Sequence, residues 1–329
     1  MSATRRLIAV VLLVPTLAAV ALWAFAWPAA RTAPRDLPLG VAGPAAATAQ
    51  VEKELARHEG AFEIHRYRDE AAARDAIEDR TVYGAVVVTA RGAELLTASA
   101  ASPVVAQLLQ QAVAGRTAAE GTGVKTVDVV PAPSTDPRGA ALNASVLPLA
   151  LAGIVAGAVV TVLGLRGLRA ALALVGAAAL VGLVAAALAD SWLGVLTGDW
   201  WAEASVFALS TLAVAAAVAG CAALAGPAGI GLVSFLVMFL GNPFSGAPSA
   251  PRMLPEPAGA IGQWLPPGAG TTLLRSVSFF DGAAATGPAL TLVWWAALGL
   301  GAVLLGTRLK ARRTPAGPAA EQWEPALVA

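Results

Sequence analysis

The sequence is short of the side chains that most enzymes and metalloproteins use. Its 329 residues include two histidines, one cysteine and only 13% charged residues. Cys221 can form no intramolecular disulfide and lies in an apolar run, as a small packing residue does. His58 and His65 fall in different expected elements, whereas a metal site needs three or four converging ligands. No G-x-S-x-G, H-E-x-x-H or C-x-x-C pattern occurs. We therefore predict a protein that is not an enzyme, with no metal and no cofactor.

Charge is also missing from the middle of six long apolar runs. These runs are Leu7–Trp27, Leu147–Leu165, Ala170–Leu188, Ser205–Leu224, Gly229–Leu240 and Pro288–Leu305. Five of them reach or approach the ~20 residues with which an α-helix crosses a bilayer, whereas Gly229–Leu240 covers only about 18 Å. Gly153 and Gly157 form a G-x-x-x-G that suits a close helix contact, although a run so rich in small residues produces this pattern by chance as well.

The sequence also disfavours an ion-driven transporter, a chain that binds ATP through its own P-loop, and a nucleic-acid partner. Ion-driven transporters carry titratable groups inside their spans, and these runs offer only groups such as Thr161, Ser210 and Ser234. No G-x-x-x-x-G-K-[ST] occurs, so the chain has no P-loop of its own for ATP. Its net charge is +1, which gives no sign of a nucleic-acid partner.

Basic residues in the short loops predict how the chain is oriented, because Lys and Arg concentrate on the cytoplasmic side. Arg5 and Arg6 precede the first run, and Arg166 and Arg169 lie in the turn after the second. Four more basic residues follow the last run, whereas the loop 190–203 is acidic and contains none. We predict a multi-pass protein of a bacterial cell membrane with both termini cytoplasmic. The first run is interpreted as an uncleaved anchor rather than a cleaved signal peptide, because it is long for a signal sequence.

The long interval after the first run predicts an external α/β domain. Strands are expected at Leu37–Val41, Phe62–Tyr67, Val82–Thr89, Glu94–Ala98 and Val124–Val130, and helices at Ala45–His58, from an Asp69 cap to Asp79, and at Pro103–Arg116. Such alternation favours a small α/β sandwich. The predicted fold class is a polytopic α-helical membrane protein of six spans, with an extracytoplasmic α/β domain between spans one and two. Its parts are an anchor (1–30), the α/β domain (31–143), a five-span domain (144–309) and a cytoplasmic tail (310–329).

The fifth run is short and is followed by residues 242–281, which are rich in Pro, Gly and Ser. Short helices are expected at Ala258–Trp264 and Thr271–Phe280, on either side of Pro266-Pro267-Gly268. Broken helices persist at membrane depth where they face protein or a water-filled cavity. We interpret this segment as a re-entrant element at the outer mouth of a pathway; the alternative is an external loop. Its candidate residues are Asn242, Pro243, Leu254, Pro255, Trp264, Pro266, Pro267 and Arg275.

Two segments carry a family resemblance. Ala71–Val88 (AAARDAIEDRTVYGAVVV) is similar to an external-domain stretch in which a helix ends and a "Y/V-G-A/V" strand begins. Met253–Arg275 (MLPEPAGAIGQWLPPGAGTTLLR) is similar to an element before the last span, where a Leu-Pro pair, a short helix, a second Pro and an Arg recur. With the layout of the spans, these segments resemble permeases of the type-two ABC exporters, and still more their YhgE/Pip-like relatives.

The resemblance implies a homodimer or pseudo-dimer that exports a lipid, peptide or drug-like amphiphile, driven by a separate ATPase subunit. Such permeases usually present a cytoplasmic coupling helix between spans two and three. Here that loop is only about Leu165–Arg169, with Arg166 and Arg169 as candidate contacts. The alternative is a membrane protein that does not transport and whose external domain binds an envelope component, a partner or a phage.

Overall fold

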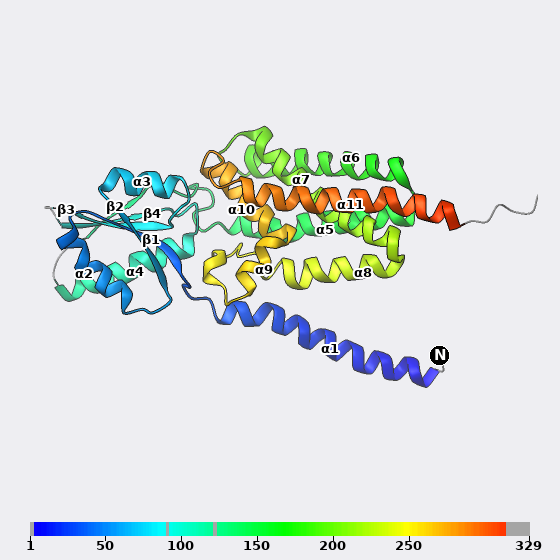
Figure 1. Cartoon of the computed structure of the whole chain (residues 1–329), viewed down its shortest axis with the longest axis horizontal. Helices are drawn as coiled ribbons and strands as arrows, with labels where there is room; N and C mark the ends of the chain where they lie inside the picture. Colours follow the sequence, from blue (N-terminus) through cyan, green and yellow to red (C-terminus); the bar gives the residue numbers. More distant parts are fainter. Residues whose placement is uncertain (1–2, 90–91, 121–123, 314–329) are drawn as a thin grey trace, which may run out of the picture.

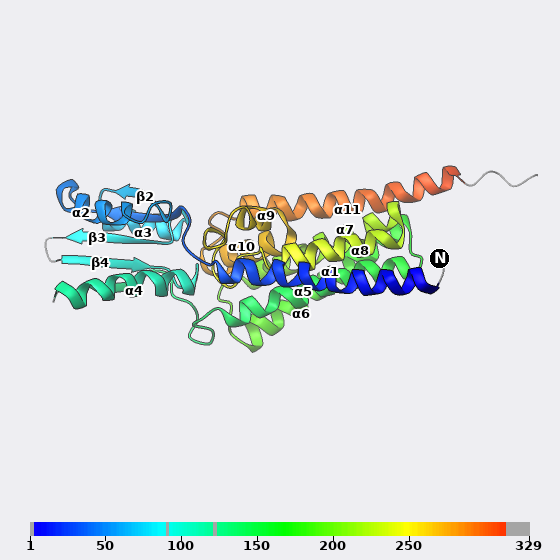
Figure 2. The same ribbon diagram turned by 90° about the horizontal axis from the view of Figure 1, so that it is seen from below.

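The structure is a computed structural model that describes residues 3–89, 92–120 and 124–313. A small domain built on a β-sheet lies against one end of a helical bundle, and the first helix runs beside the bundle (Figures 1 and 2). We call these parts the sheet domain (residues 37–128) and the bundle, and we call the two ends of the bundle its domain end and its far end. Most of the expected tail, 314–329, lies outside the described residues.

Five described helices are long and apolar enough to cross a membrane. The helices outside the sheet domain are α1 (Ala3–Ala30), α5 (Ala140–Val162), α6 (Gly167–Ala186) with its π-helical extension η1 (Ala187–Trp192), α7 (Trp200–Ala225), α8 (Pro227–Phe235) with its π-helical extension η2 (Leu236–Gly241), the 3-10 turn η3 (Pro251–Met253), α9 (Ala258–Trp264), α10 (Pro266–Phe279) and α11 (Thr286–Arg313). The candidate spans are α1, α5, α6–η1, α7 and α11, which fits a polytopic membrane protein.

The prediction of six spans is therefore too high by this criterion. The continuous helix α8–η2, Pro227–Gly241, is apolar but shorter than the other five. At 1.5 Å per residue it extends about 22 Å, against a bilayer core of about 30 Å. The physical reason lies in the sequence, because Gly241-Asn242-Pro243 ends the helix before it reaches full length.

The sheet domain has the expected α/β character. Its elements are β1 (Leu37–Ala42), α2 (Ala45–Ala56), β2 (Phe62–Tyr67), α3 (Glu70–Glu78), β3 (Gly84–Thr89), β4 (Gly92–Thr97), α4 (Pro103–Glu120) and β5 (Lys125–Asp128). The strand order is β2-β1-β3-β4-β5, in which only the β3–β4 pair is antiparallel. Helix α3 lies on one face of the sheet, and α2 and α4 lie on the other (Figure 1). Asp69 caps α3 as predicted, accepting a hydrogen bond from the Ala72 N–H at 2.9 Å.

Helix α7 is the centre of the bundle, and it is the most buried of the five long helices. Its neighbours approach closely because glycines face it. A Cβ at Gly153 would lie 2.7 Å from the Val214 Cβ, and one at Gly157 would lie 2.7 Å from the Val218 Cβ. The G-x-x-x-G of the second apolar run therefore does make the close helix contact, within the chain and against α7.

Glu203 differs from the sequence expectation. The sequence placed it in an acidic loop, outside apolar runs that were expected to be free of titratable groups. The structure places it in the first turn of α7, where its side chain is fully buried and its Oε1 accepts a hydrogen bond from the Gly198 N–H at 3.0 Å. Helix α7 begins early because the preceding Asp199 caps it, with a bond from the Ala202 N–H at 2.8 Å.

The glycine contacts predict a specific sensitivity to added volume. Gly157→Val should force α5 away from α7 and lower the free energy of unfolding by about 1–3 kcal/mol, the usual cost of overpacking. Gly176→Val in α6 is the matched control, because a Cβ there meets no atom within 4 Å. Thermal unfolding of the purified protein in detergent measures both. Equal losses in the two variants would contradict the packing described for α7.

Candidate functional site

The segment that the sequence marks as unusual, residues 242–281, lies between the two parts of the molecule. We call it the junction element. Its helices α9 and α10 lie at the domain end of the bundle (Figures 1 and 2). Eleven of the 14 residues of α10 are buried. The helix packs on α7 and α11 on one side and meets the sheet domain at its C-terminal end.

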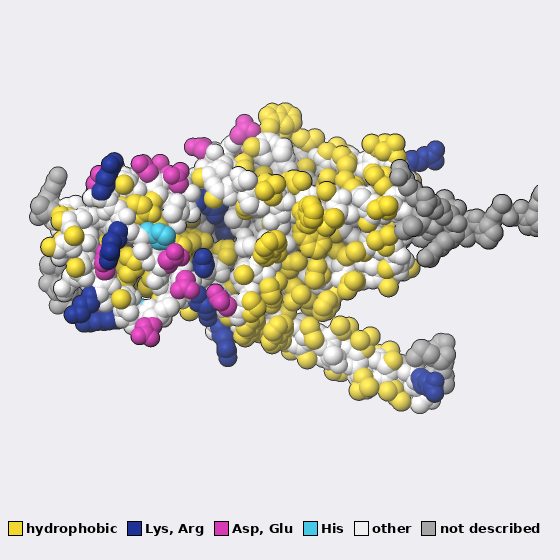
Figure 3. Space-filling model, in the orientation of Figure 1, with side chains coloured by type: hydrophobic (Ala, Val, Ile, Leu, Met, Phe, Trp, Pro, Cys, Tyr) yellow, Lys and Arg dark blue, Asp and Glu magenta, His cyan; other side chains and the backbone are white. Residues whose placement is uncertain are grey.

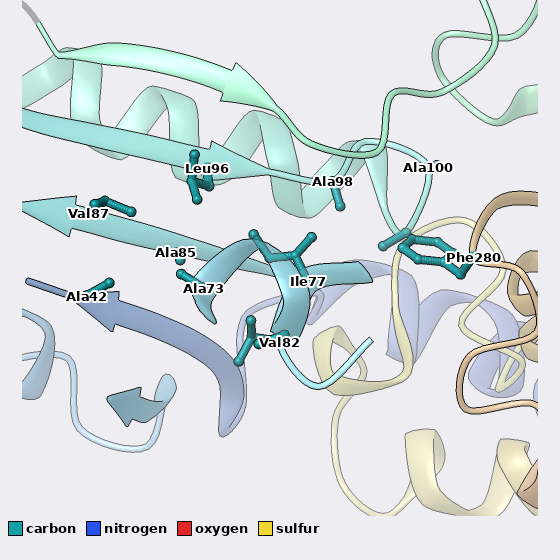
Figure 4. Close-up of a cluster of buried hydrophobic side chains, with 12 residues drawn as sticks. Ala42, Ala73, Ile77, Val82, Ala85, Val87, Leu96, Ala98, Ala100 and Phe280 are labelled. Carbon is teal, nitrogen blue, oxygen red and sulfur yellow. The ribbon is translucent and has the colours of Figure 1, made fainter. Parts of the chain in front are cut away.

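The junction element supplies side chains to the hydrophobic core of the sheet domain. Phe280, which follows α10, packs in the cluster that contains Ile77 of α3 and Val82 (Figure 4). Ala250 and Met253 pack in the cluster on the other face of the sheet, with strand β1 and helix α4. Both faces of the sheet are thus completed by chain that follows four of the bundle's helices in sequence.

Arg80 makes the main polar contact across this boundary. Its Nη1 donates hydrogen bonds to the Thr272 carbonyl at 2.9 Å and to the Ser276 hydroxyl, both on α10. Its guanidinium carbon also lies 5.1 Å from the centre of the Phe280 ring. Burial lowers the pKa of Arg80. The backbone at Arg80 is left-handed, with φ of 59°, a conformation that costs a non-glycine residue on the order of 1–3 kcal/mol unless its surroundings hold it.

Arg275 lies next to this contact and is 4% exposed. Its Nη2 donates to the Ala247 carbonyl at 2.6 Å, which ties α10 to the loop before it. Burial, and then the like charge of Arg80, lower the pKa of Arg275 to about 10, so the group stays protonated at neutral pH. Burial raises the pKa of the Tyr83 phenol, and the charges of Arg80, Arg275 and Arg252 oppose that rise. The boundary therefore holds a layer of fixed positive charge.

The link between α1 and β1 is fastened to the same element. The Ala33 N–H donates to the Met253 carbonyl at 3.0 Å, and the Arg35 N–H donates to the Arg252 carbonyl at 2.9 Å. These bonds hold the link against the 3-10 turn η3 of the junction element. The other covalent connection of the sheet domain, the chain after β5, is also held by a hydrogen bond. There the Thr135 hydroxyl donates to the Gly194 carbonyl.

The residues predicted for the re-entrant element all lie in the junction element, and they differ in how deeply they are buried. Asn242 and Pro243 are half-buried after η2, Leu254, Pro255 and Arg275 are buried, Trp264 is 75% exposed, and Pro266 and Pro267 are buried in the first turn of α10. The two prolines were expected to separate the short helices, with the second helix beginning at Thr271. They begin that helix instead, because a proline is well tolerated in a first turn, where its missing N–H costs nothing.

Arg166 and Arg169, the predicted coupling residues, lie at the far end of the bundle. The turn 163–166 joins α5 to α6, and both arginines are exposed there. A cavity of about 130 Å³ opens beside them, lined by Arg166 and by small residues such as Gly164, Ala223 and Gly306. These arginines are therefore separated from the junction element by the length of the bundle.

Helix α1 stands apart from the rest of the bundle. At its domain end Trp27 stacks on Trp23, and both rings meet Phe244 of the junction element edge-on. Phe25 meets Phe239 of η2 in the same way. Toward the far end α1 diverges, and Figure 3 shows an open cleft with hydrophobic walls between it and the bundle. The cleft is closed by aromatic contacts at one end only.

Sequence reasoning missed Arg80 and Phe280, the residues that join the sheet domain to α10. Neither carries a local sequence signal, since each follows a helix and its partners lie far away in the sequence. Among the described residues, no group of three His, Cys, Asp or Glu side chains is placed to hold a metal. In comparisons with known proteins, no family model, no curated protein and no solved structure matches this chain.

The Arg80 contact predicts a stability loss. Arg80→Ala should lower the free energy of unfolding by about 2–4 kcal/mol, because it removes charge-assisted hydrogen bonds and a cation–π contact and leaves the backbone strain in place. Arg57→Ala removes an exposed arginine paired with Glu54 and should cost at most about 0.5 kcal/mol. Chemical unfolding of the full chain in detergent compares the two. If Arg80→Ala lowers the free energy of unfolding no more than Arg57→Ala does, Arg80 does not stabilise the contact between the sheet domain and the bundle.

Proposed function

We propose that this chain is the membrane subunit of an exporter that moves a hydrophobic or amphipathic substrate outward. The observation that carries the proposal is the cleft between α1 and the bundle. Its walls are apolar, it is open to the surrounding membrane toward the far end, and aromatic side chains close it at the domain end. A membrane-dissolved amphiphile can enter such a cleft sideways, without crossing a polar barrier.

The distribution of charge supports an orientation with the sheet domain outside a bacterial cell membrane. Arg166 and Arg169 at the far end fit the cytoplasmic side, where basic residues of short loops concentrate. The exposed rings of Trp192, Trp201 and Trp264 occur at the domain end, as expected for side chains in a headgroup layer. The cleft then opens toward the inner leaflet and closes toward the outer one, which is the polarity of an exporter.

The junction element has a clear role in this proposal. It contacts α1 through Phe244, the bundle through α10 and the sheet domain through Arg80 and Phe280. A displacement of α1 by a substrate therefore reaches the sheet domain through contacts that already exist. A re-entrant element at the outer mouth of a pathway is the interpretation that we retain for it.

Energy must come from another subunit in this proposal, because the sequence has no P-loop. The exposed turn with Arg166 and Arg169, and the cavity beside it, are the candidate contact surface for a separate ATPase. A homodimer is the expected assembly, since a second copy would supply the opposite wall of the pathway to the exposed face of α1.

One observation favours the second candidate function, a membrane protein that binds an external partner without transport. The far-end connections are short: the turn 163–166 joins α5 to α6, and Gly226 alone joins α7 to α8. Neither connection contains a coupling helix that an ATPase could bind. The outcome of a single experiment on the far end therefore separates the two candidates.

We expect the full-length protein, purified from its own host in mild detergent, to carry an ATP-binding subunit with measurable ATPase activity. Arg166→Glu with Arg169→Glu should lower its recovery at least tenfold, because the reversed charges repel the same partner surface. Arg57→Glu with Arg68→Glu, on the sheet domain, makes the same change in net charge and should leave recovery unchanged. Repeated purification without an ATPase would contradict the exporter and favour the binding protein.

A further inference from the structure

The main chain of two arginines, Arg31 and Arg252, converges on Arg35 at the domain end of the α1 cleft. Arg31 follows the end of α1, Arg35 lies in the link to β1, and Arg252 is part of the junction element. The Arg35 N–H donates to the Arg252 carbonyl at 2.9 Å, and the Arg35 Nη2 donates to the Arg31 carbonyl at 2.8 Å. These bonds bring together residues that lie more than two hundred positions apart in sequence. We call the three residues the arginine cluster.

In the part of the chain that the structure describes, the cluster has no acidic partner. The ion pairs found among the described residues all lie in the sheet domain, and none involves Arg31, Arg35 or Arg252. Asp36 and Glu256 are exposed nearby in sequence, but neither carboxylate comes within 4 Å of these guanidinium groups. Uncompensated arginines are also unusual on the face that the topology assigns to the outside. A negative group from outside the protein would complete the cluster.

Arg35 is held in position for such a group. Its Nη1 donates to the Ala33 and Met253 carbonyls, each at 3.0 Å, and its side chain is half-buried. A guanidinium has five N–H donors, so two of them, the Nε–H and one Nη2–H, have no partner among the described residues. Arginine binds phosphate and carboxylate oxygens through paired donors of this kind. Because the side chain is already ordered, little conformational entropy is lost on binding.

The surface around the cluster is suited to an amphiphile. Trp27 lies one helical turn before Arg31 and contacts Phe244 at the domain end of the cleft. Exposed apolar side chains of α1 continue from there toward the far end. Figure 3 shows basic side chains over the boundary between the sheet domain and the bundle, with a hydrophobic surface next to them. Positive charge at a headgroup level with an apolar cleft beneath it matches a molecule with an anionic head and hydrocarbon chains.

We propose that the arginine cluster is the headgroup site for an anionic lipid that bears a phosphate, with the acyl chains in the cleft between α1 and the α8–η2 side of the bundle. The proposal rests on the proposed export function and names the substrate class for it. A zwitterionic lipid carries its own cation and gains less from the cluster. Free phosphate lacks the chains that the cleft would bury.

The test is lipid binding to the full-length protein in detergent, measured by native mass spectrometry. Phosphatidylglycerol should bind at least tenfold more tightly than phosphatidylcholine with the same chains, since arginines make charge-assisted hydrogen bonds to the phosphate and phosphatidylglycerol carries no cation of its own. Combined Arg31→Gln, Arg35→Gln and Arg252→Gln substitutions should reduce this preference to less than threefold. The matched control is Arg57→Gln with Arg66→Gln and Arg68→Gln, which removes three exposed arginines of the sheet domain and should keep the preference.

Two further measurements keep the result interpretable. Arg35 also bonds the backbone, so Arg31→Gln with Arg252→Gln, both at exposed positions, is expected to lower the preference at least threefold even if the triple variant unfolds. Glycerol phosphate at a hundredfold excess should fail to displace phosphatidylglycerol. Equal binding of the two lipids, an equal loss in the control variant, or displacement by glycerol phosphate would each overturn the proposal. Failure of the ATPase recovery alone would leave the lipid site standing and refute only export.

Discussion

The structure depends on a shared core at the boundary between the sheet domain and the bundle. Phe280 completes one face of the sheet, Met253 completes the other, and Arg80 hydrogen-bonds to α10 across the gap. A small domain has little apolar area to bury, so these added side chains matter to its stability. A fragment of residues 31–143 therefore lacks side chains from both of the core clusters.

The bundle gains its stability in a different way. Its helices approach α7 through glycines, as at Gly153 and Gly157, where backbones pack too closely for a side chain. In a bilayer, dispersion contacts of this kind replace the hydrophobic effect as the force that associates helices. Helix α1 takes no part in this packing and is held by aromatic rings at one end. The bundle around α7 and the attachment of α1 thus differ in the size of the side chains at their contacts.

Much of the fold could be predicted because its signals are local. Apolar length marks the long helices, alternation marks the sheet, and Asp69 before Glu70 marks the start of α3. The fifth apolar run is too short for a span, and Glu203 was misplaced because a capping aspartate starts α7 earlier than the apolar run does. Arg80 could not be predicted as a site residue, since its partners lie 192 and 196 positions away and only tertiary folding brings them together.

The most direct test of the shared core is hydrogen exchange of the full chain after Phe280→Ala. Because Phe280 packs in the same cluster as Ile77, its removal should speed exchange in α3 and β3 of the sheet domain, although Phe280 itself belongs to the junction element. Phe239→Ala removes an aromatic ring that contacts α1 and is the matched control. We predict faster exchange in the sheet domain for Phe280→Ala only. The same exchange in both variants would contradict a core shared between the sheet domain and the bundle.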